Sequence, residues 1–357
     1  MRRGLIGEHL GHSYSQRIHE TLGGYPYELI ELAPQDLDAW MKNKDFAALN
    51  VTIPYKKAVI PYLEELDERA RRIGAVNTIV NDHGRLIGKN TDYYGCRFML
   101  EQAGIEIQGR KVILLGNGGA AQAVQAVLED LGAAAIVKVK RNPSPETLTY
   151  EEAYCDHSGA QVIVNTSPVG MFPAQEGLPV ELDHFPQLES VADVIYNPHR
   201  TRLIVEAQKR GCRTATGLSM LTAQAAEAIE AFIGKPVAPK SILRMTAELA
   251  REKMNLVLIG MPGCGKSTIA RKLAEISGRP AVDIDQRIVE RIGMPIRDFF
   301  AQQGEARFRQ IEAEILAEVT LQTGQIIATG GGIVKDWENV RRLRQSGKVY
   351  FLDRSLD

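Results

Sequence analysis

Cysteine is scarce in this sequence. The four cysteines, Cys96, Cys155, Cys212 and Cys264, are scattered along the chain, and their spacing is not that of a metal site. We therefore expect unpaired thiols in a reducing compartment rather than a disulfide framework. A catalytic cysteine is the alternative, and this spacing gives it little support.

An excess of charge of one sign is also absent. The 43 lysines and arginines nearly balance the 44 aspartates and glutamates, for a net charge of −1. Such a balance gives no indication of binding to nucleic acid or to a membrane surface. The sequence contains no apolar run long enough to span a bilayer and no stretch that resembles a signal peptide. We expect a cytoplasmic protein that acts on small molecules.

Apolar residues, in contrast, are plentiful enough for sizeable cores. The chain has 357 residues, of which 44% are hydrophobic and 24% are charged. This length is typical of two or three domains. The sequence has no internal repeats or low-complexity tracts, so each domain must be located from its own motifs.

A glycine-rich stretch near residue 116 organises most of the chain. Lys111–Leu115 has the pattern of a buried parallel strand, and Ala120–Leu131 that of the helix after it. Free N–H groups at such a helix start favour a phosphate, so we interpret the turn as the grip on a dinucleotide pyrophosphate. The turn comprises Gly116, Asn117, Gly118, Gly119 and Ala120, which departs from the full G-x-G-x-x-G pattern. A purely structural turn is the alternative.

The next predicted strand, Ala135–Val139, ends in Lys140 and Arg141. In a site for NAD, an acidic residue usually stands at this position and binds the ribose hydroxyls. Basic residues instead suit the 2′-phosphate of NADP, and Arg141 can also stack on the adenine. The sequence therefore favours NADP as the cofactor.

Two serines follow the first predicted strand. Ser13 and Ser15 come shortly after the strand Gly4–Gly7, and they offer two hydroxyls to one ligand. Serine is also common at the start of a helix, and the helix predicted over Gln16–Leu22 begins directly afterwards. Helix capping is therefore the alternative to ligand binding.

A lysine stands beyond the end of another predicted strand. The apolar residues from Ala47 onward lead into Asn50, Thr52 and Lys56. In open α/β sheets, ligands bind beyond the carboxyl ends of the strands. A partly desolvated lysine at that place can act as a proton donor. A surface lysine at the start of the next helix is the alternative.

A hairpin is predicted next. We expect a strand over Ile73–Val80, a turn at Asp82–Gly84 and a second strand that leads to Asp92. This arrangement would bring Asn77 close to Asp92. Asp92 also stands where it can cap the helix that follows through Leu100.

These motifs, in this order, resemble the shikimate dehydrogenase family. The resemblance extends from about residue 4 to about residue 250 and rests on Ser13-x-Ser15, Asn50-Val51-Thr52-x-Pro54-x-Lys56, Ala75-Val76-Asn77-Thr78 and Asn90-Thr91-Asp92. It implies that Lys56 and Asp92 form the catalytic pair beside the reacting oxygen. It also implies a set of residues that bind the hydroxyls and carboxylate of shikimate: Ser13, Ser15, Asn50, Thr52, Asn77, Tyr196 and Gln224.

The same resemblance implies the reaction, which is reduction of 3-dehydroshikimate to shikimate with NADPH. A cationic lysine would stabilise and protonate the oxygen that becomes negative when hydride reaches the ketone. The ends of the strands Val162–Asn165 and Val191–Tyr196 would line the nicotinamide side, together with Gly217. The helix Met220–Phe232 would carry Gln224 to the substrate, and a plain core helix is the alternative.

A second phosphate-binding pattern begins near residue 255. The buried strand Leu256–Ile259 is followed by Gly260-x4-Gly265-Lys266-Ser267 and a helix, which is the complete P-loop pattern in its expected setting. In such a loop, Lys266 reaches the β- and γ-phosphates and Ser267 coordinates Mg²⁺. The residues expected to bind ATP are Gly260, Gly263, Cys264, Gly265, Lys266, Ser267 and Thr268.

The residues after the P-loop resemble the shikimate kinase family. The resemblance rests on the predicted strand Ala281–Asp285, on Phe308-Arg309-x-x-Glu312 within the segment Phe299–Ile315, and on the glycines that end Ile326–Gly332. It implies that Asp283 joins Ser267 in the Mg²⁺ shell. Shikimate would be held by Asp285, Arg309, Gly330, Gly331 and Gly332. A helix cap at Asp285 and a surface ion pair at Arg309 are the alternatives.

This second resemblance covers only residues 254–357. The shikimate kinase family continues into an arginine-bearing lid and a final strand. Without them, the predicted strand Val349–Leu352 would become an exposed sheet edge, and the transferred phosphoryl group would lose a stabilising cation. We therefore expect a kinase domain that is truncated before its lid.

Together these patterns predict an α/β protein in three parts. Residues 1–95 would form an α/β substrate domain, completed by helices within residues 218–252. Residues 96–217 would form a Rossmann-like NADP domain, and residues 254–357 a C-terminally incomplete P-loop kinase domain.

We expect this chain to couple two steps of aromatic amino acid biosynthesis, reduction of 3-dehydroshikimate and ATP-dependent phosphorylation of shikimate to shikimate 3-phosphate. One alternative is a dehydrogenase whose C-terminal module binds ATP or shikimate without catalysis. Another is an NAD-dependent quinate/shikimate dehydrogenase, which the Lys140-Arg141 pair argues against. Neither composition nor motif indicates an oligomeric state.

Overall fold

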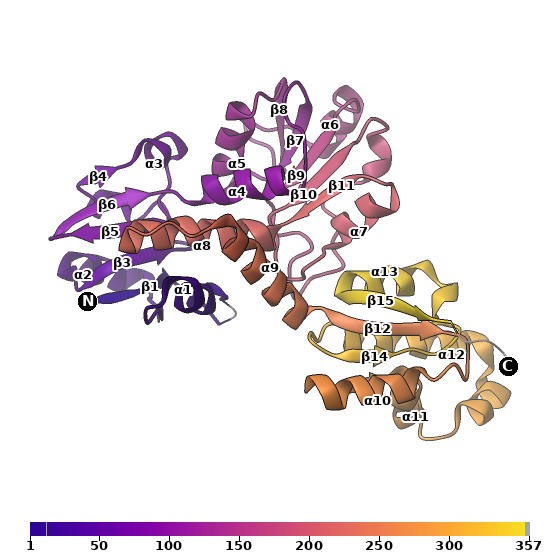
Figure 1. Cartoon of the computed structure of the whole chain (residues 1–357). Coiled ribbons are helices and arrows are strands. Elements are labelled where there is room, and N and C mark those ends of the chain that lie inside the picture. Colours follow the sequence, from indigo (N-terminus) through magenta and orange to yellow (C-terminus); the bar gives the residue numbers. More distant parts are fainter. Residues whose placement is uncertain (12, 354–357) are drawn as a thin grey trace. The chain divides into compact units, whose positions relative to one another are not determined.

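The described residues form mixed α/β structure around three sheets, which confirms the predicted fold class (Figure 1). The computed structural model describes residues 1–11 and 13–353. Within those ranges, no helix is both long enough and apolar enough to cross a membrane.

The first sheet is mixed and has the strand order β2-β1-β3-β5-β6-β4. β1 pairs in parallel with β2 and β3, whereas β5 runs antiparallel to both β3 and β6. The side chains of neighbouring residues of β1 lie on opposite faces of the sheet, since Leu5 and Ile6 belong to different core clusters. The strands are β1 (Arg2–Gly7), β2 (Glu28–Glu31), β3 (Phe46–Val51), β4 (Glu65–Leu66), β5 (Thr78–Asp82) and β6 (Arg85–Lys89).

Short helices and turns connect these strands. They are α1 (Ser15–Gly23), the 3₁₀ turn η1 (Pro34–Asp36), α2 (Leu37–Asn43), the 3₁₀ turn η2 (Ile60–Tyr62) and α3 (Glu68–Ile73). The strand predicted over Ile73–Val80 is wrong in its first half. Ile73 ends α3, and Gly74 closes that helix at a φ of 69°, donating its N–H to the Ala70 carbonyl. The strand starts only at Thr78, so Asn77 lies in the connecting segment.

The second sheet is wholly parallel and has the strand order β11-β10-β9-β7-β8. The inner strand β7, between β9 and β8, has the fully buried residues Val112–Leu115, as expected for a parallel sheet covered on both faces. The strands are β7 (Lys111–Leu115), β8 (Ala135–Val139), β9 (Val162–Asn165), β10 (Ser190–Asp193) and β11 (Arg213–Thr216). The connecting elements are α4 (Asp92–Gln102), α5 (Gly119–Asp130), α6 (Tyr150–Asp156), the 3₁₀ turn η3 (Leu182–His184) and α7 (Arg202–Lys209). The strands predicted at 111–115, 135–139 and 162–165 are confirmed.

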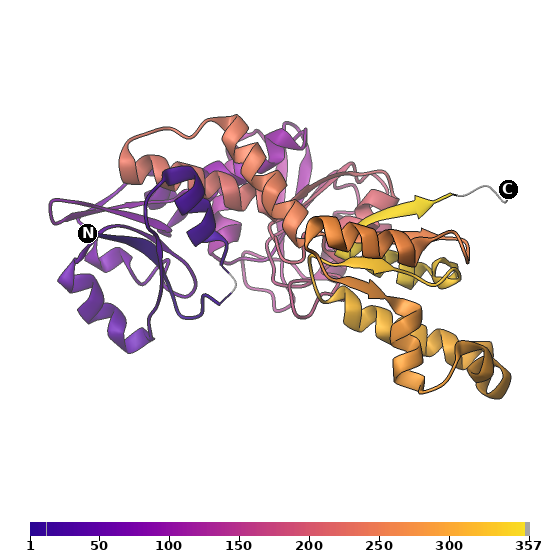
Figure 2. The same cartoon turned by 60° about the horizontal axis from the view of Figure 1, so that its bottom comes forward.

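Helix α8 (Gly217–Ile233) returns from the second sheet to the first, as Figures 1 and 2 show. It packs on α1, α4, β3 and β5. Its residues Ile229 and Phe232 share a core cluster with Leu5 and Tyr27. The sequence predicted this helix over Met220–Phe232, and it begins one turn earlier. Helix α9 (Pro239–Lys253) follows.

The third sheet is parallel, with the order β13-β14-β12-β15. The strand predicted over Ala281–Asp285 stops at Asp283, because the Asp283 carboxylate caps the next helix by accepting from the N–H groups of Asp285 and Gln286. The strands are β12 (Asn255–Gly260), β13 (Ala281–Asp283), β14 (Ile326–Ala328) and β15 (Gly347–Leu352). The connecting elements are α10 (Lys266–Ser277), α11 (Ile284–Ile292), α12 (Ile296–Thr320), the 3₁₀ turn η4 (Ile333–Lys335) and α13 (Trp337–Ser346).

The chain divides into two compact units. The first comprises residues 1–169, 178–196 and 206–247, and the second comprises residues 170–177, 197–205 and 248–357. Two loops that follow β9 and β10 thus belong to the unit of the third sheet. In that unit the fully buried Arg341 pairs with Glu176, and the Gln345 side chain donates to the Gln175 carbonyl at 3.0 Å. No sequence motif indicated this association.

Candidate functional site

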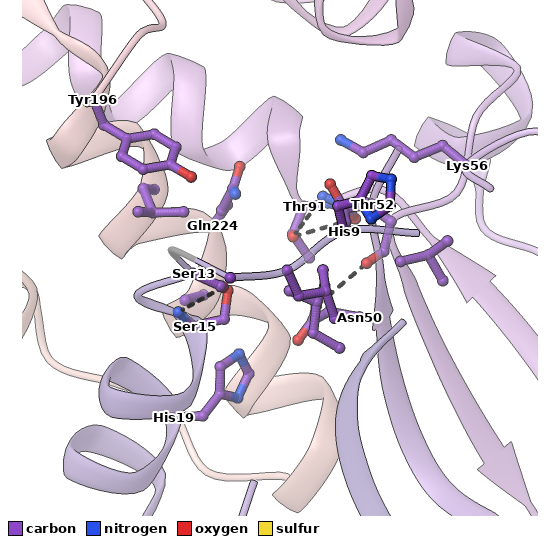
Figure 3. Close-up of a pocket in the computed structure, with 17 residues that line it drawn as sticks. His9, Ser13, Ser15, His19, Asn50, Thr52, Lys56, Thr91, Tyr196 and Gln224 are labelled. Carbon is purple, nitrogen blue, oxygen red and sulfur yellow. Dashed lines mark hydrogen bonds between the residues drawn. The ribbon is translucent and has the colours of Figure 1, made fainter. Parts of the chain in front are cut away.

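A cavity of about 380 Å³ opens in the first unit (Figure 3). Its walls come from the segment after β1, the ends of β3 and β10, the segment before β5, and α8. All seven residues that the resemblance assigns to substrate binding line it, and so does Lys56. The seven are Ser13, Ser15, Asn50, Thr52, Asn77, Tyr196 and Gln224.

The two serines lie at the start of α1. The Ser15 N–H donates to the Ser13 hydroxyl at 3.2 Å. Tyr14 occupies the N-cap position of the helix and has no side-chain cap bond. The tyrosine rings of Tyr14 and Tyr196 contact each other with centroids 5.6 Å apart, which links this segment to the end of β10.

Lys56 and Asp92 form an ion pair at the cavity. Lys56 Nζ donates to Asp92 Oδ2 at 2.6 Å. The Asp92 side chain is 3% exposed and that of Lys56 21% exposed, so solvent screens the pair only weakly. Asp92 is the first residue of α4, where the helix dipole favours a carboxylate. Its side chain does not cap the helix, because it is turned to Lys56 and Asn77.

Asn77, in the segment just before β5, holds the Asp92 side of this ion pair in place. Its amide donates to Asp92 Oδ1 at 2.9 Å and to the Thr91 hydroxyl at 3.1 Å. The Asn77 side-chain oxygen Oδ1 accepts from the Thr91 N–H at 2.8 Å. The predicted proximity of Asn77 and Asp92 is therefore confirmed, although Asn77 precedes the strand instead of lying within it.

The cavity also has lining residues to which the sequence motifs assign no role. His9, His19 and Thr91 line the same cavity. His19 is buried, its Nδ1 lies 2.7 Å from the Tyr25 hydroxyl, and burial lowers its pKa to about 3, so the ring is neutral. The spacing of four residues from Ser15 places His19 on the same face of α1, and that was the one signal available.

The glycine turn between β7 and α5 fits a phosphate. Gly116 has a φ of 104°, and a Cβ there would lie 2.8 Å from the Thr166 hydroxyl, so only glycine suits this position. A Cβ at Gly118 would meet no atom within 4 Å, which leaves open space before the helix. No side chain caps the start of α5, so its first N–H groups remain available to an anion. A Cβ at Gly119 would lie 3.9 Å from Lys56 Cδ, which puts the turn beside the ion pair.

Three further predicted cofactor residues, Lys140, Arg141 and Gly217, have clear positions. Lys140 and Arg141 follow β8 and are exposed, as a site for a 2′-phosphate requires. Gly217 begins α8, and a Cβ there would lie 2.0 Å from the Val194 carbonyl oxygen. Close packing alone therefore accounts for glycine at position 217.

The second unit contains the P-loop between β12 and α10. Lys266 is buried, and its Nζ donates to the carbonyl oxygens of Gly260 at 2.9 Å and Met261 at 2.8 Å. The Ser267 hydroxyl lies 2.5 Å from Asp283 Oδ2, so two oxygen ligands of the kind that Mg²⁺ prefers stand together. Among the described residues, no group of three or more His, Cys, Asp or Glu side chains forms a metal site.

A cavity of about 570 Å³ joins the P-loop to the predicted shikimate-binding residues of the second unit. Arg309 Nη1 donates to Glu312 Oε2 at 2.7 Å, and burial raises the pKa of Glu312. Burial, with the neighbouring Asp283, also raises the pKa of Asp285. Glu312 lines the cavity although no role was assigned to it from the sequence. The other lining residues include Gly263, Gly265, Lys266, Ser267, Thr268, Gly330, Gly331 and Gly332.

Comparison with known proteins relates the two parts of the chain to two families. Residues 5–79 match the family model described as the shikimate dehydrogenase substrate binding domain. Residues 262–357 match the family model described as shikimate kinase.

Individual relatives cover the first part of the chain. The shikimate dehydrogenase (NADP(+)) of Moorella thermoacetica is 36% identical over 262 residues, which are 66% of this chain and 89% of that protein. The corresponding protein of Halothermothrix orenii is 39% identical over 265 residues, with 65% of this chain and 90% of that protein covered.

Solved structures of shikimate dehydrogenases are also similar to this chain. A chorismate mutase/shikimate 5-dehydrogenase fusion protein from Clostridium acetobutylicum is 35% identical, with a TM-score of 0.65 over 69% of this chain and 96% of that one. Shikimate 5-dehydrogenase from Thermus thermophilus, in complex with NADP(H) and shikimate, is 30% identical, with a TM-score of 0.62 over 70% of this chain and 99% of that one.

Proposed function

The chain belongs to the shikimate dehydrogenase family and carries a shikimate kinase domain, and from this we propose that it catalyses two consecutive reactions. The first is reduction of 3-dehydroshikimate to shikimate with NADPH. The second is transfer of phosphate from ATP to the 3-hydroxyl of shikimate. The product of the first reaction is the substrate of the second, which gives the fusion a chemical purpose.

The ion pair of Lys56 and Asp92 carries the first assignment. NADPH, when bound, supplies the hydride that converts a ketone into an alcohol. The ketone oxygen becomes negative in that step, and the Lys56 ammonium both stabilises it and gives it a proton. Asp92 holds the ammonium in place at 2.6 Å, and the glycine turn that we propose to bind the cofactor lies beside Lys56.

Substrate contacts follow from the polar lining of the first cavity. Ser13 just before α1, Ser15 at its start and Gln224 of α8 offer hydroxyl and amide groups to a polyhydroxylated ring. Tyr196 completes the wall from the end of β10. For the cofactor, exposed Lys140 and Arg141 favour the 2′-phosphate of NADP over the free hydroxyl of NAD.

The shared cavity of the P-loop and Arg309 supports the second reaction. Lys266 and the backbone of the loop would bind the ATP phosphates, and Ser267 with Asp283 would hold Mg²⁺. Arg309 presents a planar guanidinium suited to a carboxylate, and Asp285 lies across the same cavity as a partner for ring hydroxyls. The cavity thus has groups for both substrates.

The test is ADP release by the purified chain with shikimate and Mg·ATP, measured beside NADPH oxidation with 3-dehydroshikimate. Lys266→Ala should abolish shikimate-dependent ADP release and leave NADPH oxidation unchanged, whereas Lys56→Ala should do the reverse. If the wild-type chain oxidises NADPH but releases no ADP, the C-terminal module is a binding module and the proposal of two reactions is wrong.

A second candidate concerns the cofactor and substrate of the first reaction. Quinate dehydrogenase from Corynebacterium glutamicum in complex with NAD is 28% identical to this chain, with a TM-score of 0.62 over 70% of this chain and 98% of that one. We expect kcat/KM with NADP and shikimate to exceed that with NAD and quinate. The opposite order would assign this chain to the catabolic reaction.

A further inference from the structure

Tyr27 contacts two lining residues of the first cavity, His19 and Asn50, without lining it itself. The residue precedes β2 and is 1% exposed. Its ring stacks on that of His19, with centroids 4.0 Å apart and an angle of 18° between the planes. Its hydroxyl reaches Asn50 Oδ1 at 2.7 Å. A buried tyrosine thus contacts, by its one polar atom, a residue of the cavity wall.

The direction of this hydrogen bond is fixed by the protonation of the phenol. Burial, followed by the nearby Tyr25, raises the pKa of Tyr27 well above its usual value. The hydroxyl therefore keeps its proton and must donate it, because a buried polar hydrogen without a partner is costly. The acceptor is Asn50 Oδ1, which sets the orientation of the Asn50 amide.

That orientation leaves Asn50 with little to donate. Its Nδ2 lies 3.3 Å from the Asn77 carbonyl oxygen and 3.1 Å from the Thr78 hydroxyl. These two contacts use both hydrogens of the amide. Toward the cavity, Asn50 can then offer only the remaining lone pair of Oδ1.

The bonds continue in the same direction toward the ion pair. The Thr78 hydroxyl donates to Asn77 Oδ1 at 3.1 Å, and Asn77 Nδ2 donates to Asp92 Oδ1 at 2.9 Å. Four hydrogen bonds therefore run in one direction, each residue donating to the next: Tyr27 to Asn50, Asn50 to Thr78, Thr78 to Asn77, and Asn77 to the Asp92 carboxylate. Bonds aligned in this way polarise one another.

We propose that Tyr27 is a positioning residue that makes Asn50 an obligate hydrogen-bond acceptor, so that the site selects a ring hydroxyl able to donate at that point. The inference rests on the proposed dehydrogenase function and adds how the site recognises one hydroxyl of the substrate, by accepting a hydrogen bond from it. A ring that presents a carbonyl or an ether oxygen at the same point meets a second acceptor and is rejected.

The variant that tests the proposal is Tyr27→Phe, with Tyr25→Phe as its matched control. Both remove one phenol hydroxyl from the same aromatic cluster, but the Tyr25 hydroxyl contacts His19 and has no bond to Asn50 among the described contacts. Tyr27→Phe should raise KM for shikimate about tenfold, the value of one hydrogen bond, with KM for NADP unchanged. Tyr25→Phe should leave both constants near those of the wild type.

A series of substrate analogues separates positioning from a general loss of structure. The series contains shikimates that each lack one ring hydroxyl or carry it as a methyl ether. With the wild type, the analogue altered at the hydroxyl that meets Asn50 should lose about tenfold in kcat/KM. With Tyr27→Phe this particular discrimination should disappear while the others persist. An equal loss with every analogue would overturn the proposal.

Thr78→Val provides an independent variant in case Tyr27→Phe does not fold. It removes the acceptor of one Asn50 N–H, frees that donor, and should reduce the same discrimination. Unchanged discrimination in both variants means that Tyr27 does not set the amide. Failure of the wild type to oxidise shikimate with NADP would instead refute the proposed function, so the two failures are distinguishable.

Discussion

Lys56 and Asp92 stand 36 positions apart in the sequence, yet Lys56 Nζ lies 2.6 Å from Asp92 Oδ2 at the wall of the first cavity. Replacing the lysine by alanine removes the group that would stabilise and protonate the substrate oxygen. We predict that Lys56→Ala lowers kcat by about 10²- to 10⁴-fold, the usual contribution of a positioned acid. The measurement is NADPH oxidation with 3-dehydroshikimate.

The control for this change is the neighbouring Lys57, which is exposed. Lys57→Ala should keep wild-type turnover, and calorimetry should show that Lys56→Ala still binds shikimate with an affinity close to that of the wild type. Turnover that survives in Lys56→Ala would show that another group supplies the proton.

The residues of the first cavity were predictable because they follow strand ends in short motifs. Asn50 lies in the last part of β3, Thr52 and Lys56 follow that strand, and Asp92 stands just after β6, so local sequence places each of them. Tyr27 and His19 were not predictable, because their roles depend on contacts with Asn50 and Tyr25 that only the folded chain forms. Sequence motifs thus identify residues that line the cavity, whereas the residues that support them from the core can be identified only from the packing of the folded chain.

The errors in the fold also have local causes. The apolar residues from Ile73 to Val80 suggested one strand, but Gly74 adopts the left-handed conformation that ends a helix. Asp283 ended β13 earlier than predicted because its side chain caps α11. The loops 170–177 and 197–205 belong to the second unit. The first of them contacts residues distant in sequence, such as Arg341, and a periodic sequence pattern cannot reveal such contacts.

Gly217 and Gly118 were both predicted to contact the cofactor, and the structure gives them different environments. Gly217→Ala would place a Cβ 2.0 Å from the Val194 carbonyl oxygen, whereas Gly118→Ala would meet no atom within 4 Å. We predict that Gly217→Ala lowers the free energy of unfolding by about 2 kcal/mol or more. Gly118→Ala should unfold like the wild type but raise KM for NADPH, because its methyl group enters the space proposed for the pyrophosphate.

Chemical denaturation measures the stability of the two glycine variants, and cofactor titration measures their KM for NADPH. A Gly217→Ala protein of wild-type stability would show that the backbone at Val194, just after β10, moves to accommodate the methyl group. An unchanged KM for NADPH in Gly118→Ala would place the pyrophosphate elsewhere.

We predict that Glu227 makes the stability of the first unit depend on pH. One oxygen of its carboxylate pairs with Arg69 at 2.7 Å, and the other is buried without a hydrogen-bond partner. Burial, opposed by Arg69, raises the pKa of Glu227 from 4.5 to about 7. Between these values the folded chain holds a proton that the unfolded chain releases, so stability falls as pH rises from about 4.5 to about 7.

Glu227→Gln should remove this part of the pH dependence. The two pKa values set an upper bound of about 3 kcal/mol for the loss, and the exposure of Arg69 reduces it to about 1–2 kcal/mol. Denaturation at pH 5 and at pH 7.5, about the two ends of the titration, measures the difference in each protein. Equal changes with pH in the wild type and in Glu227→Gln would mean that the carboxylate is ionised throughout this range.

Arg341 tests whether the loop 170–177 stabilises the second unit. Its guanidinium is fully buried and pairs with Glu176 of that loop and, at 2.9 Å, with Glu338 of α13. The Glu176 and Glu338 side chains are 56% and 44% exposed, so solvent would still hydrate their carboxylates without Arg341. Arg341→Ala would instead empty a buried site and leave the Gln345 side-chain oxygen without its donor, so it should cost about 2–4 kcal/mol of stability. The matched control is Arg287, whose side chain is 58% exposed and lies 3.6 Å from Glu290; Arg287→Ala should cost less than about 1 kcal/mol. Similar losses in the two variants, measured by denaturant unfolding, would show that Glu176 and its loop contribute nothing beyond a surface ion pair.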